Sequence, residues 1–99
     1  MKLTWHSEAR MELREALAYY RDQAGLDVAR RIAQDAKAAA QQVLAYPELG
    51  ARISHGTRRF VLNDFPYTLI YRVATGTGTV VILAVAHHSR RPGYWVGRR

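Results

Sequence analysis

The spacing of the apolar residues changes at Pro47, and this change limits the possible folds more than any other feature of the sequence. Before Pro47, apolar side chains recur every three or four residues over residues 8–24 and 28–46, which is the spacing of one buried helix face. After Pro47 they alternate with polar residues or run together in short stretches, which is typical of strands. The pattern therefore predicts two helices followed by a β-sheet.

Short signals mark where each predicted helix begins and ends. Ser7 and Asp27 are suitable N-caps, because their side-chain oxygens can accept hydrogen bonds from free backbone N–H groups. Gly25 is the expected C-cap of the first helix, and Pro47 ends the second because the residue before a proline avoids helical geometry. Alanines along the second helix allow close approach, so we expect the two helices to form an antiparallel hairpin.

Four segments are expected to be strands. They are Lys2–Trp5, Arg58–Asn63, Tyr67–Val73 and Thr79–Ala86, and the last is almost wholly apolar, as is usual for a central strand covered on both faces. The predicted order is β-α-α-β-β-β, an α+β fold in which a helical hairpin packs on a small antiparallel-rich sheet. Because the chain has only 99 residues, we expect one domain spanning residues 1–99.

The net charge of +7 is concentrated in the C-terminal half of the chain. Residues 1–50 hold seven basic and seven acidic side chains, whereas residues 51–99 hold eight arginines and one acid, Asp64. Such asymmetry predicts a positive surface that attracts a polyanion or an acidic protein. Because all eight cations are arginines, forked hydrogen bonding to carboxylate or phosphate is favoured over diffuse charge attraction.

The composition excludes several classes of protein. The chain has no cysteine, so disulfides and thiolate metal sites are impossible, and we expect neither a metal nor a cofactor. The lack of cysteine also fits a reducing cytosol, and we expect a cytoplasmic protein. No apolar run approaches the roughly 20 residues that a membrane-spanning helix needs, so no membrane partner is expected.

Several motifs are similar to those of one family. They are Tyr46-Pro47-Glu48-Leu49-Gly50 with Arg58-Arg59-Phe60, then Phe65-Pro66-Tyr67-Thr68-Leu69-Ile70-Tyr71-Arg72-Val73, and finally Ala84-Val85-Ala86-His87 followed by Arg90-Arg91-Pro92-Gly93-Tyr94-Trp95. Together with the predicted order of elements, they resemble the ParE/RelE superfamily of toxins from type II toxin–antitoxin systems. The resemblance covers nearly the whole chain. It implies a cognate antitoxin that wraps around the toxin and silences it. A higher-order toxin–antitoxin complex is also compatible with the resemblance.

The resemblance also implies one of two targets. ParE relatives act on DNA gyrase, whereas RelE relatives are endoribonucleases that cut mRNA in the ribosome without a metal ion. RelE-like enzymes carry an arginine where this chain has Thr68, and their basic pair on the preceding strand is reduced to Arg59 because Val61 takes the other position. The chain is therefore closer to ParE. We expect a gyrase-binding inhibitor rather than an enzyme, with the ribosome-dependent ribonuclease as the alternative.

These alternatives supply two sets of candidate site residues. In a ribonuclease, proton transfer and charge stabilisation would fall to Arg59, Arg72, His87, His88, Arg90 and Tyr94. The candidates for binding the target or the antitoxin are Arg52, Arg58, Arg59, Arg72, Arg90, Arg91, Tyr94 and Trp95.

The strand pattern restricts how these residues can be combined. Neighbouring side chains on a strand point to opposite faces, so at most one of His87 and His88 is expected in any given site, and one imidazole is expected to cap the strand end. Tyr94 and Trp95 are expected to pack while the neighbouring arginines project, and Arg72 is expected to face away from the helices. Four tyrosines are expected in the core or between helices and sheet: Tyr19, Tyr20, Tyr67 and Tyr71.

Overall fold

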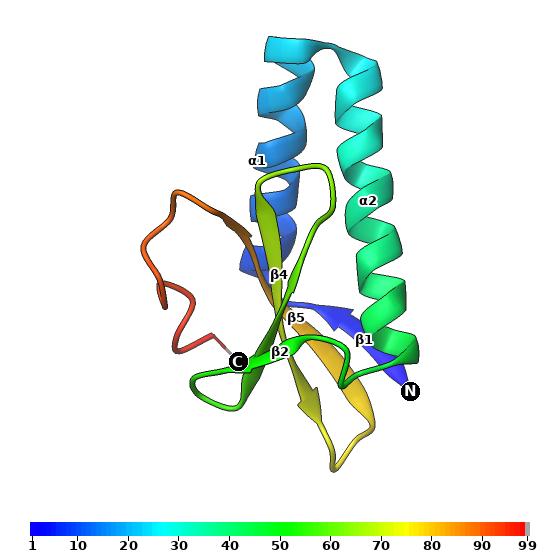
Figure 1. Cartoon of the computed structure of the whole chain (residues 1–99), viewed down its shortest axis with the longest axis vertical. Coiled ribbons are helices and arrows are strands. Elements are labelled where there is room, and N and C mark those ends of the chain that lie inside the picture. Colours follow the sequence, from blue (N-terminus) through cyan, green and yellow to red (C-terminus); the bar gives the residue numbers. More distant parts are fainter. Residues whose placement is uncertain (99) are drawn as a thin grey trace.

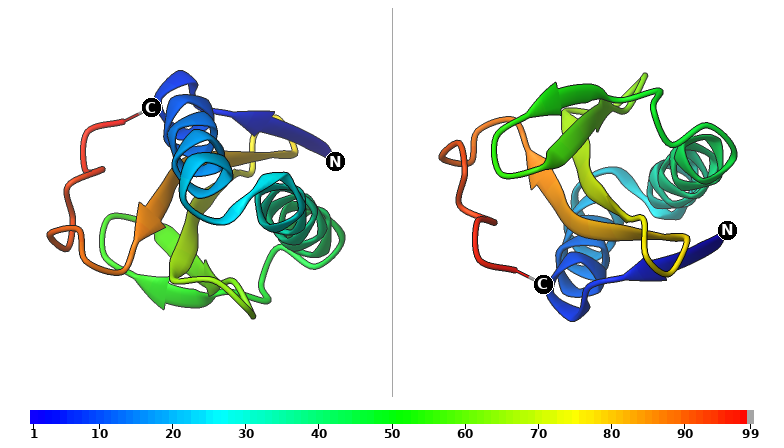
Figure 2. Two further views of the ribbon diagram at one scale, coloured as in Figure 1. Left: turned by 90° about the horizontal axis from the view of Figure 1, so that it is seen from above. Right: turned by 90° about the horizontal axis from the view of Figure 1, so that it is seen from below.

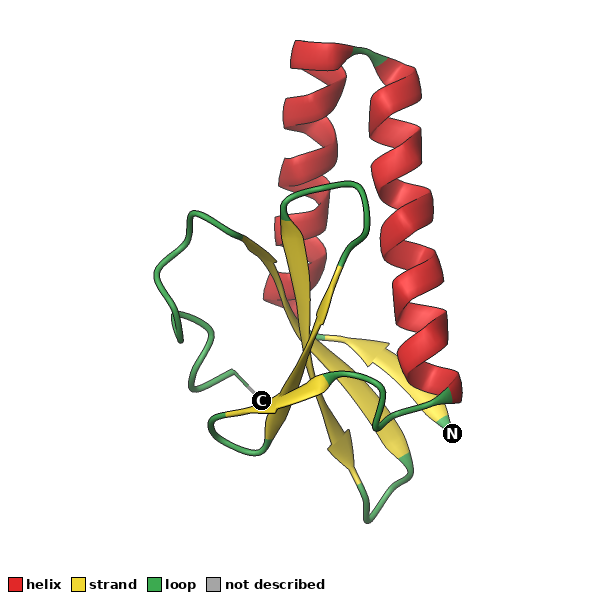
Figure 3. Cartoon of the chain, in the orientation of Figure 1, coloured by secondary structure: helices red, strands yellow, loops and turns green. Residues whose placement is uncertain are grey.

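The structure, a computed structural model, describes residues 1–98 and has the expected α+β architecture. Its elements are β1 (Lys2–Trp5), α1 (Ser7–Ala24), α2 (Leu26–Ala45), β2 (Ala51–Ile53), β3 (Thr57–Val61), β4 (Tyr67–Ala74) and β5 (Thr79–His87). The helical hairpin and the strands are confirmed, as Figures 1 and 3 show. The three-residue strand β2 was not expected, because it is too short to show an alternating pattern. The observed order is therefore β-α-α-β-β-β-β.

One five-stranded sheet holds all the strands, in the order β1-β5-β4-β3-β2. Strand β1 runs parallel to β5, and every other neighbouring pair is antiparallel, so the sheet is antiparallel-rich as expected. The apolar strand β5 lies between β1 and β4, and its residues from Ile82 to Val85 are buried. The prediction of a covered internal strand is confirmed.

Two predicted helix caps are wrong by one or two positions. Helix α1 begins at Ser7 and its N-cap is His6, whose Nδ1 accepts a hydrogen bond from the backbone N–H of Glu8. Helix α2 begins at Leu26 with Gly25 as its N-cap, and Asp27 lies inside the first turn. Gly25, with a φ of 95°, also ends α1, so a single residue separates the helices. A one-residue link leaves no room for the separate cap that Asp27 would have supplied.

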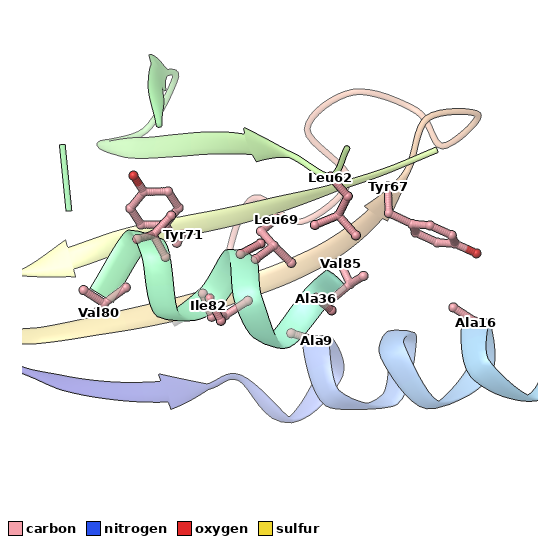
Figure 4. Close-up of a cluster of buried hydrophobic side chains, with 13 residues drawn as sticks. Ala9, Ala16, Ala36, Leu62, Tyr67, Leu69, Tyr71, Val80, Ile82 and Val85 are labelled. Carbon is pink, nitrogen blue, oxygen red and sulfur yellow. The ribbon is translucent and has the colours of Figure 1, made fainter. Parts of the chain in front are cut away.

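The core lies between the hairpin and the sheet. Alternate residues of β4 (Tyr67, Leu69, Tyr71) meet alanines of both helices, together with Val80, Ile82 and Val85 of β5 (Figure 4). The opposite face of the sheet is covered by Trp95, which is 5% exposed and packs on Ile70, Leu83 and Ala84. Trp95 therefore packs as expected. Tyr19 does not, because its side chain is 59% exposed and only Tyr20 of the pair joins the core.

The hairpin and the C-terminal segment extend in different directions from the sheet. The molecule is elongated, with principal extents of 41 × 27 × 21 Å, and the distal halves of both helices project beyond the strands (Figure 1). After β5 the chain leaves the sheet and returns (Figure 2), so that Arg98 lies beside Glu8 near the start of α1. This return brings residues far apart in the sequence into contact.

Candidate functional site

A groove lined by three arginines lies where the end of α2 meets the β2–β3 hairpin and β4. Its volume is about 920 Å³, and we call it the basic groove. Its cations are Arg52, Arg58 and Arg72, and its apolar lining includes Met1, Ala45, Tyr46, Pro47, Ile53 and Val73. Glu48 is the one acid among the residues found to line it. The groove therefore combines strong positive charge with an apolar surface.

Strand pairing explains why two of these arginines are close together. Arg52 and Arg58 are directly opposite each other in the antiparallel pair β2–β3. Like charges at such positions repel each other. Within residues 1–98 the ion pairs involve only Arg30 and Arg98 among the basic side chains, so no carboxylate neutralises this pair. Their mutual repulsion is therefore not offset by an acidic side chain of residues 1–98.

Arg58 is held in place by backbone carbonyls. Its Nη1 donates hydrogen bonds to the carbonyl oxygens of Glu48 (3.2 Å) and Gly50 (2.8 Å). A guanidinium has five N–H donors, so most of this group remains available to a ligand. Arg58 is therefore a pre-positioned cation rather than a freely moving side chain.

The loop between α2 and β2 is also fixed from beneath by Tyr71. The Tyr71 hydroxyl accepts a hydrogen bond from the N–H of Gly50 (2.9 Å) and donates one to the carbonyl of Pro47 (2.8 Å). A Cβ atom at position 50 would lie 2.7 Å from this hydroxyl oxygen, so only glycine fits without displacement. The wall of the basic groove that carries the exposed Tyr46 is consequently rigid.

A second group of polar side chains ties the C-terminal segment to α1. Glu12 accepts hydrogen bonds from the Tyr94 hydroxyl (2.7 Å), from Arg98 (2.8 and 3.1 Å) and from the backbone N–H of Val85 (3.0 Å). Arg98 also donates to the carbonyl of Leu83 and pairs with Glu8. Strand β1 pairs only with residues 79–82 of β5. Glu12 and Arg98 thus form hydrogen bonds with backbone groups of β5 beyond the point where β1 ends.

This network changes the pKa of its members. Burial alone would raise the pKa of Glu12, but the hydrogen bonds from Arg98, Tyr94 and Val85 and the charge of Arg98 outweigh it, so the pKa is lowered. The pKa of Tyr94 is raised, first by burial and then by its hydrogen bond to the Glu12 carboxylate. Tyr94 is therefore held protonated, as a hydrogen-bond donor to a structural partner.

The tail surface consists of Arg90, Arg91 and Tyr94. The Arg90 guanidinium carbon lies 3.9 Å from the centre of the Tyr94 ring, a cation–π contact. Both arginines are exposed, while Tyr94 is half-buried. The expectation that the aromatic residues pack and the arginines project is confirmed.

The two histidines lie on opposite faces of the sheet. His87 stacks edge-on against Tyr67, and its Nδ1 accepts a hydrogen bond from the N–H of Ser89, so it caps the strand end as expected. The Nε2 of His88 lies 3.0 Å from the hydroxyl of Thr68, which faces away from the helices. Thr68 therefore contacts an imidazole on the face of the sheet that points away from the helices.

The structure does not bring the six candidate ribonuclease residues into one site. Arg90 and His87 line the same small pocket, and Tyr94 is beside Arg90. Arg72 faces outward as expected, because it pairs with Val81. It is five residues along β4 from Tyr67, the residue that pairs with His87, and this separation is about 17 Å. His88 is on the other face, and Arg59 is exposed and pairs with Ile70, so that it points away from the basic groove. The arginines are thus spread over separate surfaces rather than forming one face.

Sequence reasoning missed Glu12, Arg98 and the Tyr71–Gly50 contact. Glu12 is three residues after Ala9 and four before Ala16, both of which are buried. That spacing places Glu12 at the border of the buried face and was the available signal. For Arg98 and Gly50 no local signal exists, because their partners are far away in the sequence.

Across residues 1–98, no three side chains of the metal-binding types His, Cys, Asp and Glu are grouped as a metal site would need. Neither α1 nor α2 is long and apolar enough to cross a membrane.

Comparison with solved structures first defines the class of fold. One match is a chain from a structure described as the chromosomal ParDE TA system from P. aeruginosa, with a TM-score of 0.77 and 22% sequence identity. The match covers 88% of this chain and 95% of that chain, so the two share their fold over nearly their whole length. No curated protein sequence matched the chain.

Residues 3–92 match the family model described as the ParE toxin of the type II toxin–antitoxin system parDE. The chain belongs to this family. It is therefore the toxin component of a type II toxin–antitoxin system, and a cognate antitoxin is its implied partner. The expectation of a ParE-like toxin is confirmed. Tyr94 and Arg98, which bind Glu12, lie beyond the matched residues.

Proposed function

We propose that the chain acts on DNA gyrase as a binding inhibitor, that it catalyses no reaction itself, and that its antitoxin prevents this contact. Membership of the ParE family supports gyrase as the target, because ParE relatives act on this enzyme. The exposed cations Arg90 and Arg91 of the tail surface are the proposed contacts with gyrase.

The arrangement around Tyr94 carries the argument for binding rather than catalysis. Metal-independent RNA cleavage needs a proton acceptor, a proton donor and cations that converge on one phosphate. The Tyr94 hydroxyl is instead committed to Glu12 at 2.7 Å, and Arg72 is distant on β4. This separation favours a protein that acts by contact.

Two assays on the purified chain test the proposal. The chain should inhibit negative supercoiling of relaxed plasmid by purified gyrase, and it should leave mRNA intact on translating ribosomes. Addition of the antitoxin should restore supercoiling. Cleavage of mRNA at the ribosomal A site with normal supercoiling would overturn the proposal and support the ribonuclease alternative.

A further inference from the structure

We propose that the basic groove is the site where an acidic, extended segment of the antitoxin binds, with a carboxylate at Arg52 and Arg58 and an apolar side chain beside Tyr46. This inference rests on the toxin function stated above only in that it requires an antitoxin. It does not depend on gyrase being the target.

Unpaired charge is the first observation. Arg52 and Arg58 are opposite one another across two strands, and Arg72 reaches the same groove from β4. None of the three forms an ion pair with another side chain of residues 1–98. A carboxylate bound to Arg52 and Arg58, which lie on the same face of the sheet, would gain attraction and relieve their repulsion in the free toxin. Arg72, on the other face of β4, adds to the positive charge of the groove lining.

The apolar lining distinguishes a peptide from a nucleic acid. The groove includes Tyr46, Pro47, Ile53 and Val73 beside its cations. A phosphodiester backbone would leave this apolar surface uncovered, whereas a peptide presents carboxylates and apolar side chains together. Tyrosine and arginine are also the residue types that contribute most to protein–protein binding. The composition of the groove therefore fits a protein segment.

The fixed position of the loop between α2 and β2 is a further, independent observation. Tyr71 fixes the loop at Pro47 and Gly50, and Arg58 is hydrogen-bonded to the same loop. Tyr46, which is 71% exposed, begins this loop. Binding to a wall that is already ordered costs little conformational entropy, and this favours tight association. A toxin that must be kept silent needs such a stable complex.

The position of the groove supports the antitoxin rather than gyrase as the occupant. It lies at the Arg72 end of β4, whereas the tail surface follows the end of β5 that pairs with Tyr67. The two surfaces are thus separate, which leaves the tail surface for the target.

The test measures binding of the purified cognate antitoxin by isothermal titration calorimetry. The double charge reversal R52E/R72E should weaken binding about a hundredfold or more, because an attraction becomes a repulsion. Arg58 is left unchanged because it supports the loop. The matched control R10E/K37E reverses two exposed cations on α1 and α2, outside the groove, and should change the affinity less than threefold.

A second pair of variants tests the apolar part without any change of charge. Tyr46→Ala should weaken antitoxin binding about tenfold or more. Tyr19→Ala, which removes a tyrosine of similar exposure outside the groove, should not. Since both side chains are exposed, circular dichroism and the melting temperature should show that both variants are folded.

The outcomes separate this inference from the proposed function. Antitoxin binding by R52E/R72E that matches the wild type, or an equal loss in R10E/K37E, would overturn the inference and leave gyrase inhibition untouched. Selective loss in the groove variants supports it even if the wild-type toxin fails to inhibit gyrase. Loss of gyrase inhibition in R52E/R72E with antitoxin binding retained would assign the groove to the target and overturn the inference.

Discussion

Arg98 and Glu12 are joined by two hydrogen bonds of 2.8 and 3.1 Å across 86 residues of sequence. Both side chains are largely buried, with relative exposures of 12% and 13%. The pair fixes the C-terminal segment against α1 and keeps Tyr94 beneath the projecting Arg90. The geometry of the tail surface thus depends on a carboxylate in the first third of the chain.

Glu12→Gln should lower the free energy of unfolding at pH 7 by about 1–3 kcal/mol, because a charged acceptor of four hydrogen bonds is lost. The pH dependence has a defined sign. The pKa of Glu12 is lowered from 4.5 in the folded state, so its stabilisation is present above 4.5 and is lost as pH falls through the folded value.

Urea unfolding between pH 7 and pH 3 measures this effect. The wild type should lose stability below about pH 4.5 more steeply than Glu12→Gln does. Glu15→Gln, which changes an exposed carboxyl one turn away, should alter stability by less than about 0.5 kcal/mol. Parallel curves for the wild type and Glu12→Gln would show that Glu12 is not the group responsible.

Gly50→Ala should destabilise the toxin by about 2–4 kcal/mol, because the new Cβ would lie 2.7 Å from the Arg59 carbonyl and the Tyr71 hydroxyl. Thermal unfolding followed by circular dichroism measures the change. The control is Gly76→Ala in the β4–β5 turn, where no atom lies within 4 Å of the added Cβ. Its effect should stay within about 1 kcal/mol, and an equal loss in both variants would contradict the close-contact argument.

Tyr71→Phe should destabilise the toxin by about 2–4 kcal/mol, since it leaves the Gly50 N–H and the Pro47 carbonyl without their partner. It should also raise amide hydrogen exchange at Gly50 more than in the rest of the molecule. Tyr20→Phe, at an aromatic ring that packs on the core, is the control. Unchanged exchange at Gly50 would mean that Tyr71 does not hold the loop.

Arg90→Ala with Arg91→Ala should weaken gyrase inhibition on the order of tenfold or more, because two exposed cations that attract an anionic partner are removed. The melting temperature should not change. The effect should shrink as the salt concentration of the supercoiling assay rises, since exposed charges are screened. Full inhibition by the double variant at low salt would exclude the tail surface as the contact with gyrase.

Two kinds of prediction succeeded because they depend on local patterns. Helical and alternating spacing located both helices and four of the five strands, and Gly25 and Pro47 marked the ends of the helices. The opposite directions of His87 and His88 followed from strand alternation alone. The strand β2 was not predicted because three residues are too few to show an alternating pattern. The N-caps are His6 and Gly25 rather than Ser7 and Asp27, because the helices begin one or two residues earlier than expected.

The sequence alone determined the class of fold, the division between helices and sheet, and the excess of arginine in the C-terminal half, because each is a property of residue type and spacing along the chain. Only the tertiary structure decided where those arginines lie. Folding pairs Arg98 with Glu12, collects Arg52, Arg58 and Arg72 in one groove, and leaves Arg90 and Arg91 on the tail. The physical reason is that charges interact through space, so their partners are set by strand register and by the return of the chain, which local sequence does not encode.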